Sequence, residues 1–170
     1  MKVEKVNAFV ALMRPPSGEG LKAYLAAAVK ALGGRSDAAL ARTMGVPPST
    51  VAAWKRRGGI PDGHYSWFST TLAEKIMEAK SEAYAGEDVP VAAVLNLLFQ
   101  TNHNPWGLDP QSALVAAPRI VRELTPLAGF LIDAHPDKWG DTSSSQVVAS
   151  LTELLEGAVL SDTRLFRSSL

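Results

Sequence analysis

Residues 36–57, SDAALARTMGVPPSTVAAWKRR, place small and apolar residues at the spacings that two short helices joined by a tight turn require. Ala41 is small enough for two helices to cross closely, and Gly45, four residues later, permits the left-handed backbone of a sharp turn. Val51 and Trp54 are three residues apart, so on a second helix they share one face and bury it against the first. This spacing predicts a helix-turn-helix.

The outward face of the second predicted helix is small, hydroxylated and basic, which suits the major groove of double-stranded DNA. Side chains at the start of such a helix reach base edges, and later basic side chains hold phosphates. The candidates for base contact are Ser49, Thr50 and Ala53, and those for phosphate contact are Lys55, Arg56, Arg57 and Arg42, with Arg35 as an alternative to Arg42. The alternative is an ordinary helical hairpin, in which Gly45 only ends a helix and the arginines are solvated.

The block TMGVPPSTVAAWKRRGGIP, residues 43–61, resembles the DNA-binding domain of the phage CI-type repressor family. The resemblance rests on a small polar start of the recognition helix, a tryptophan, a basic pair and a glycine turn closed by Ile-Pro. It implies a lambda-repressor-like helical bundle over about residues 20–85. Consecutive Pro47 and Pro48 depart from the family, whose turn commonly carries a serine. Pro48 is tolerable as the first helical residue, where no amide donor is missed.

The charge of the chain is unevenly distributed along its length. Residues 1–68 hold ten basic and four acidic side chains, a net charge of +6, whereas residues 69–170 hold seven basic and thirteen acidic side chains, a net charge of −6. This asymmetry favours a polyanion as the partner of the first half. The chain has no cysteine, and its first residues mix charges into a short apolar run that does not fit a secretory signal. We expect a cytoplasmic, mostly helical protein without a membrane span.

Apolar periodicity and breaker residues predict an all-α fold: a helix-turn-helix bundle followed by a helical C-terminal domain. The domains predicted are an N-terminal segment at 1–20, a DNA-binding domain at 21–85 and a helical oligomerisation or interaction domain at 86–170. The apolar residues of Val3 to Met13 fit strand and helix spacings alike, so the state of that segment stays open. Helices are expected over 21–32, 36–44, 48–57, 62–84, 91–101, 118–134 and 144–160, with Ser36 and Ser143 or Ser144 as N-caps and a kink at Pro126.

Residues 86–170 do not resemble the self-cleaving, β-rich C-terminal domain that many CI-type repressors carry. Beyond residue 68 the only lysines are Lys75, Lys80 and Lys138, and strand-and-turn patterning is missing. The apolar stripes of this half are candidates for self-association, because one recognition helix reads few base pairs and a homodimer doubles the site. The alternatives are that these stripes bury one another within a monomer, or that this half contacts a protein partner.

No set of residues supports catalysis, metal binding or a cofactor. His64, His103 and His135 lie too far apart along the chain for helical ligand spacing. The polar residues around Trp139, which are Asp133, His135, Asp137 and Asp141, are expected to form a loop, and Asn102 to Gly107 a turn anchored by Trp106. The chain also has no phosphate-binding glycine loop. The sequence therefore predicts a protein that is not an enzyme.

Two functions from different classes fit these features. The first is a sequence-specific transcription regulator, a phage-type repressor that acts as a dimer. The second is the small DNA-recognition subunit of a phage DNA-packaging machine, which also joins a helix-turn-helix to a helical oligomerisation region and would form a ring. In a variant of the first, the acidic half contacts RNA polymerase and the protein is an activator.

Overall fold

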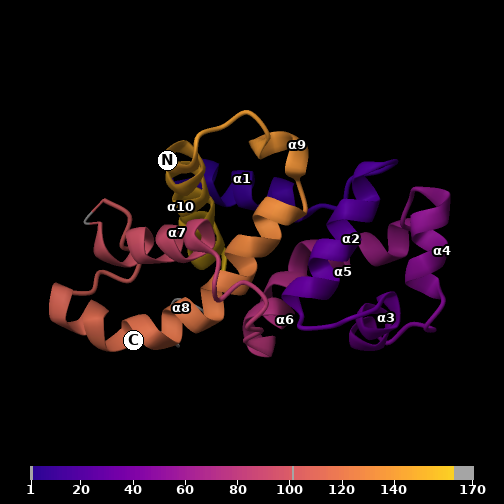
Figure 1. Ribbon diagram of the computed structural model, residues 1–170, viewed down its shortest axis with the longest axis horizontal. Helices are drawn as coiled ribbons and strands as arrows, with labels where there is room; N and C mark the ends of the chain where they lie inside the picture. Colours follow the sequence, from indigo (N-terminus) through magenta and orange to yellow (C-terminus); the bar gives the residue numbers. More distant parts are fainter. Residues whose placement is uncertain (1, 101, 163–170) are drawn as a thin grey trace.

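The computed structural model describes residues 2–100 and 102–162, and every regular element in these ranges is a helix (Figure 1). This confirms the expected all-α class. In chain order the helices are α1 (Lys2–Met13), α2 (Gly20–Ala31), α3 (Asp37–Met44), α4 (Thr50–Arg57), α5 (Asp62–Thr70), α6 (Leu72–Ala79), α7 (Asp88–Phe99), α8 (Pro110–Asp133), α9 (Pro136–Trp139) and α10 (Ser144–Ser161).

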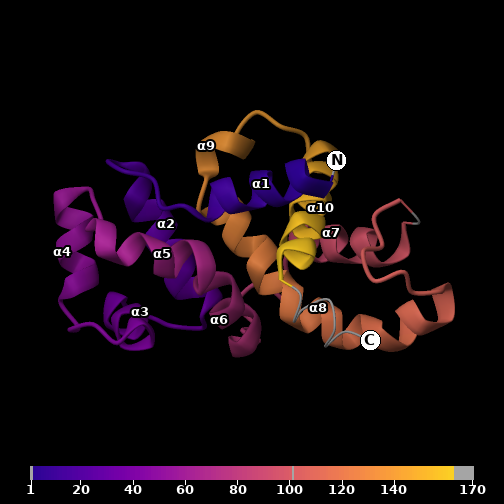
Figure 2. The same cartoon turned by 180° about the vertical axis from the view of Figure 1, so that it is seen from behind.

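The N-terminal segment, whose state the sequence left open, is the helix α1, and it packs on α10 near the other end of the chain (Figures 1 and 2). The two backbones approach closely at Gly157, where an added Cβ would collide with the carbonyl of Lys5. Glycine is therefore required at this crossing for steric reasons. The contact brings the first and last described helices together.

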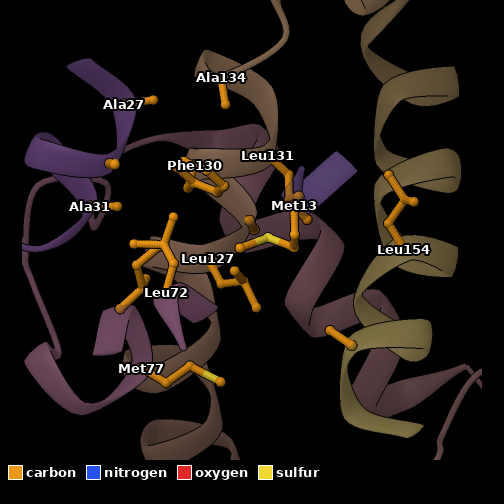
Figure 3. Packing of buried hydrophobic residues seen from close by; sticks show 14 of the residues in the cluster. Met13, Ala27, Ala31, Leu72, Met77, Leu127, Phe130, Leu131, Ala134 and Leu154 are labelled. Carbon is orange, nitrogen blue, oxygen red and sulfur yellow. The ribbon is translucent and has the colours of Figure 1, made fainter. Parts of the chain in front are cut away.

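Helix α8 runs through the middle of the molecule and joins its two ends into one apolar core. It packs against α2 and α6 on one side and against α7 and α10 on the other. Figure 3 shows Leu127, Phe130 and Leu131 of α8 lying between the alanines of α2 and Leu154 of α10. The core is thus continuous across residues 85 and 86, where the sequence placed a domain boundary. The division of the chain into an N-terminal segment, a DNA-binding domain and an oligomerisation or interaction domain stays a prediction.

The helix predicted over 62–84 is in fact two helices, α5 and α6, which meet at Thr71. Two hydroxyl groups bond back to carbonyls four residues earlier: Ser69 to Tyr65 at 3.3 Å and Thr70 to Ser66 at 2.6 Å. Such bonds compete with the helical backbone pattern and bend or end a helix. The second helix also ends earlier than predicted, because Lys80 adopts a left-handed conformation with φ of 48°.

An N-terminal cap moves the predicted start of the longest helix in the second half. Helix α8 begins at Pro110 rather than 118 because the Asp109 carboxylate accepts from the amides of Gln111 and Ser112. It continues through Pro118 and Pro126 and bends along its length (Figure 1). Residues expected to form a loop after His135 contain the short helix α9, which has proline at its first position.

Helix α7 begins at Asp88 rather than 91, and its predicted end at Thr101 lies outside the described residues. Helix α10 begins with a reciprocal cap, in which Ser143 and Gln146 bond to each other's backbone amides, as the sequence predicted for Ser143 or Ser144. Ser36 precedes α3 as predicted, but its side chain makes no capping hydrogen bond.

Substitution of Gly157 tests the crossing of α1 and α10. Gly157→Ala should lower the free energy of unfolding by about 1–3 kcal/mol, because the backbones must separate to admit the methyl group. Gly63→Ala is the matched control: an added Cβ there meets nothing within 4 Å, and the position is helical. Urea unfolding of the control should show stability equal to or above that of the original chain. Equal stability of the Gly157 variant would contradict the close crossing.

Candidate nucleic-acid interface

Helices α3 and α4 are joined by a turn that begins at Gly45. Gly45 has φ of 72°, the left-handed conformation predicted for it, and the amide of Val46 bonds back to the carbonyl of Ala41 at 3.0 Å. Helix α4 begins at Thr50 rather than at Pro48 as predicted. The amide of Thr50 closes a turn onto the carbonyl of Pro47 at 3.0 Å, so both prolines lie within the turn.

The inward face of α4 is the one that the sequence predicted. Val51 is fully buried, and Trp54 is 1% exposed. The Trp54 ring packs edge-on against Phe68 of α5 with centroids 6.3 Å apart, and His64 lies against it at 5.0 Å. Ala41 is also fully buried on α3. These apolar contacts set the orientation of α4, and therefore which of its side chains face outward.

The predicted base-contacting residues lie at the start of α4 and differ in accessibility. Ser49 is exposed, whereas Thr50 and Ala53 are half-buried. All three are accessible at least in part, whereas Val51 and Trp54 are buried. The hydroxyls of Ser49 and Thr50 can donate or accept hydrogen bonds, and the methyl groups of Thr50 and Ala53 offer apolar contact.

Lys55, which the sequence suggested as a phosphate contact, forms an ion pair within the protein instead. Its Nζ lies 2.6 Å from Oδ1 of Asp37, the first residue of α3, and both side chains are about three-quarters buried, with 25% and 29% exposed. The pair connects the start of α3 to the end of α4. Sequence reasoning missed it because the partners are 18 residues apart and on different helices. The acidic residue at the start of the motif was the available signal.

Lysines and arginines are used differently in this structure. Within residues 2–100 and 102–162, every ion pair involves a lysine or a histidine, and none involves an arginine. The exposed arginines on and around α3 and α4 are Arg35, Arg42, Arg56 and Arg57. Their positive charges are thus not neutralised by described carboxylates. An arginine guanidinium is planar and carries five donors, which suits phosphate oxygens.

The loop before α2 lies beside the C-terminal end of α4, a contact that the sequence did not indicate. The amide of Gly18 donates to the carbonyl of Gly58 at 2.8 Å, and Gly58 directly follows Arg57. Gly58 has φ of 69°, and an added Cβ would lie 3.4 Å from Cα of Gly18. The sequence identified both segments only as helix breakers, since nothing local pairs them.

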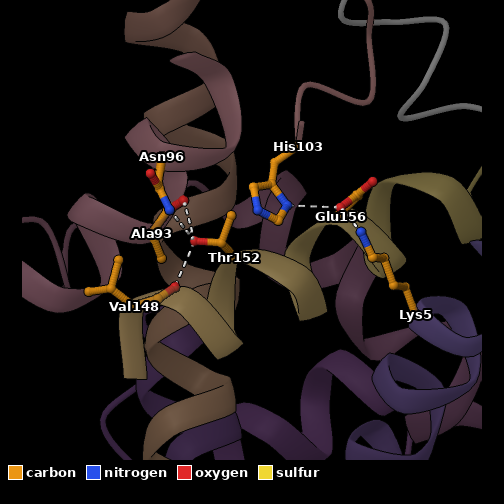
Figure 4. A network of polar contacts seen from close by, with 7 residues as sticks. All are labelled: Lys5, Ala93, Asn96, His103, Val148, Thr152 and Glu156. Atoms are coloured by element: carbon orange, nitrogen blue, oxygen red, sulfur yellow. Dashed lines mark hydrogen bonds and ion pairs between the residues drawn. The ribbon is translucent and has the colours of Figure 1, made fainter. Parts of the chain in front are cut away.

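Both histidines of the second half, together with Glu156 and Asp133, form contacts within the fold. Glu156 is 8% exposed and accepts from Lys5 Nζ at 2.6 Å, and its carboxylate lies 3.2 Å from Nδ1 of His103 (Figure 4). The polar residues near Trp139 separate: Asp133 accepts from the Tyr84 hydroxyl at 2.9 Å, whereas His135 turns toward α1. In the described ranges no three histidine or acidic side chains gather as a metal site would require.

Comparisons of this chain with protein-family models, curated proteins and solved structures found no match. None of the described helices combines the length and the hydrophobicity that crossing a bilayer requires.

His135 forms a contact between α1 and the junction of α8 and α9. Its Nε2 donates to the carbonyl of Leu12 at 2.6 Å. Burial lowers the pKa of His135, the bond to Leu12 raises it in part, and the charge of Lys138 lowers it again, so the net shift is downward. The unfolded chain therefore takes up a proton before the folded chain does as the pH falls.

The free energy of unfolding should fall as the pH drops from about 6.5 through the lowered pKa of His135 and should level off below it. His135→Gln keeps a donor for Leu12 but does not titrate, so it should remove this part of the pH dependence. Urea unfolding of both proteins across this range provides the measurement. The other histidines are present in both proteins, so their contributions cancel when the two free energies of unfolding are subtracted. Parallel curves would contradict the assignment to His135.

Proposed function

We propose that this protein is a sequence-specific DNA-binding transcription regulator in which α3 and α4 form a helix-turn-helix. The observation that carries the proposal is the combination of an inward-facing Val51 and Trp54 with exposed arginines that form no ion pair among the described residues. Such a surface combines small side chains on the accessible part of α4 with exposed positive charge beside them. The resemblance of residues 43–61 to phage CI-type repressors supports the same function.

In this proposal α4 lies in the major groove of double-stranded DNA. Ser49, Thr50 and Ala53 face base edges, and their chemistry gives modest selectivity, because none of them forms a bidentate pair with a base. Arg56 and Arg57 bind phosphates at the end of α4. Arg42, or Arg35 as the alternative to it, binds a further phosphate. Lys55 acts through Asp37 by holding α3 and α4 together, rather than as a phosphate contact of its own.

We further propose that the regulator is a repressor that binds as a homodimer through its second half. A dimer presents two recognition helices to a two-fold symmetric site and so compensates for modest selectivity per half-site. Light scattering tests this step directly. A dimer supports the regulator, whereas a ring of many subunits supports a DNA-packaging subunit.

Neutralising the arginines tests the phosphate contacts. Arg56→Gln and Arg57→Gln should each weaken binding to duplex DNA and lower the slope of log affinity against log salt by about one. Arg119→Gln on α8, a helix whose first half lies away from α4 (Figure 1), removes the same charge and should have a smaller effect. Arg56, Arg57 and Arg119 are all exposed, so the thermal melting of each variant should be unchanged. Equal binding by all three variants would contradict the proposed interface.

Exchanging the base-contacting residues tests sequence recognition. A triple substitution, Ser49→Ala with Thr50→Gln and Ala53→Asn, should change the sequence that is selected from random DNA. Salt-sensitive, non-specific binding should stay nearly intact, because the arginines remain. Selection with the original chain and the variant in parallel gives both results. An identical selected motif would show that these three residues do not read bases.

A further inference from the structure

The loop formed by residues 14–19 and the start of α5 enclose a surface notch beyond the C-terminal end of α4. The notch has a volume of about 580 Å³ and is lined by Arg14, Pro15, Pro16, Ser17, Asp62 and Tyr65. The hydrogen bond from Gly18 to Gly58 holds the loop at this position, immediately after Arg57 (Figures 1 and 2). The notch therefore adjoins the basic end of α4 and lies outside the motif itself.

The side chains of the notch provide the donors that a phosphate group requires. Arg14 is exposed and forms no ion pair with a described residue. Its guanidinium can give two parallel hydrogen bonds to phosphate oxygens. Ser17 and Tyr65 add hydroxyl donors. Two consecutive prolines, of which Pro15 is buried, restrict the backbone between Arg14 and Ser17, so the loop is preorganised.

We propose that this notch binds a phosphate of the DNA backbone that flanks the segment read by α4, an inference that rests on the proposed function. Because Gly58 follows Arg57 directly, a backbone strand that is held at the end of α4 continues toward the loop. The site extends the phosphate contacts from α4 to the segment that connects α1 with α2. It thereby lengthens the contacted DNA beyond what the two helices of the motif cover.

Asp62 sets the strength of this site. Asp62 lines the same notch, and its negative charge repels a phosphate, so it opposes the attraction by Arg14. The two residues therefore have opposite expected effects on affinity. Removing the charge of Asp62 strengthens binding, and removing the charge of Arg14 weakens it.

The first test is an NMR titration of the full chain with a random-sequence duplex of about two helical turns, followed through backbone amide shifts. Shifts at Ser17, Gly18 and Tyr65 together with residues 50–57 are the expected result. Shifts at α4 alone overturn the notch and leave the proposed function standing. Shifts at the notch alone overturn the assignment of DNA binding to α4, and shifts at neither overturn both. Inorganic phosphate at equal phosphate concentration is the second probe: equal shifts with both ligands assign a free-phosphate site and overturn the DNA contact.

The second test compares variants in duplex binding at several salt concentrations. Arg14→Gln should lower affinity by roughly threefold to tenfold and reduce the salt slope by about one. Tyr65→Phe should lower affinity with the slope unchanged, since no charge is lost, and Asp62→Asn should raise affinity.

Controls of equal charge are Arg119→Gln on α8 and Asp137→Asn on α9, both exposed. Thermal melting of each variant verifies that it folds. If Arg14→Gln and Asp62→Asn act no more strongly than these controls, long-range charge explains the effect and the notch proposal is overturned.

Discussion

The packing of Tyr24 connects α2 to α1, α5 and α8. Its buried ring lies edge-on to Phe68 of α5 at 5.8 Å and to Phe130 of α8 at 5.2 Å, and its hydroxyl donates to the carbonyl of Met13 at the end of α1. Edge-on aromatic pairs add to the stabilisation from burial alone. Through Phe68 the same contacts reach Trp54, so the orientation of α4 depends on the central core.

A second principle is the division of charge between lysine and arginine. Lys30 lies 3.0 Å from Glu87, 3.3 Å from Asp133 and over the ring of Tyr84, and thus connects α2 to the second half. Burial lowers the pKa of Lys30, but the hydrogen bonds and charges of Glu87 and Asp133 together raise it, so the net shift is upward. Part of the positive charge of residues 1–68 is therefore paired with acidic residues of the second half. What remains at the surface near α4 is mainly arginine, which favours phosphate as the partner.

The candidate interface was predictable where its residues are close in sequence. The left-handed Gly45, the buried Val51 and Trp54, and the exposed Arg56 and Arg57 all follow from spacing within one short segment. Most of the helices were predicted for the same reason, but α1 was left open, α9 was expected to be a loop, and α5 and α6 were predicted as one helix. Within one or two helical turns the backbone repeat fixes which side chains share a face, so the spacing of residues in the sequence predicts that face.

The sequence by itself therefore determined the helical class, the turn between α3 and α4 and the inward face of α4. The tertiary structure alone decided three contacts: α1 packs on α10, Asp37 forms an ion pair with Lys55, and the amide of Gly18 donates a hydrogen bond to Gly58. These contacts join residues distant along the chain. Their selection depends on how complete helices fit around a shared core, since packing must satisfy all faces at once. The spacing of residues along the chain does not predict which helices pack together.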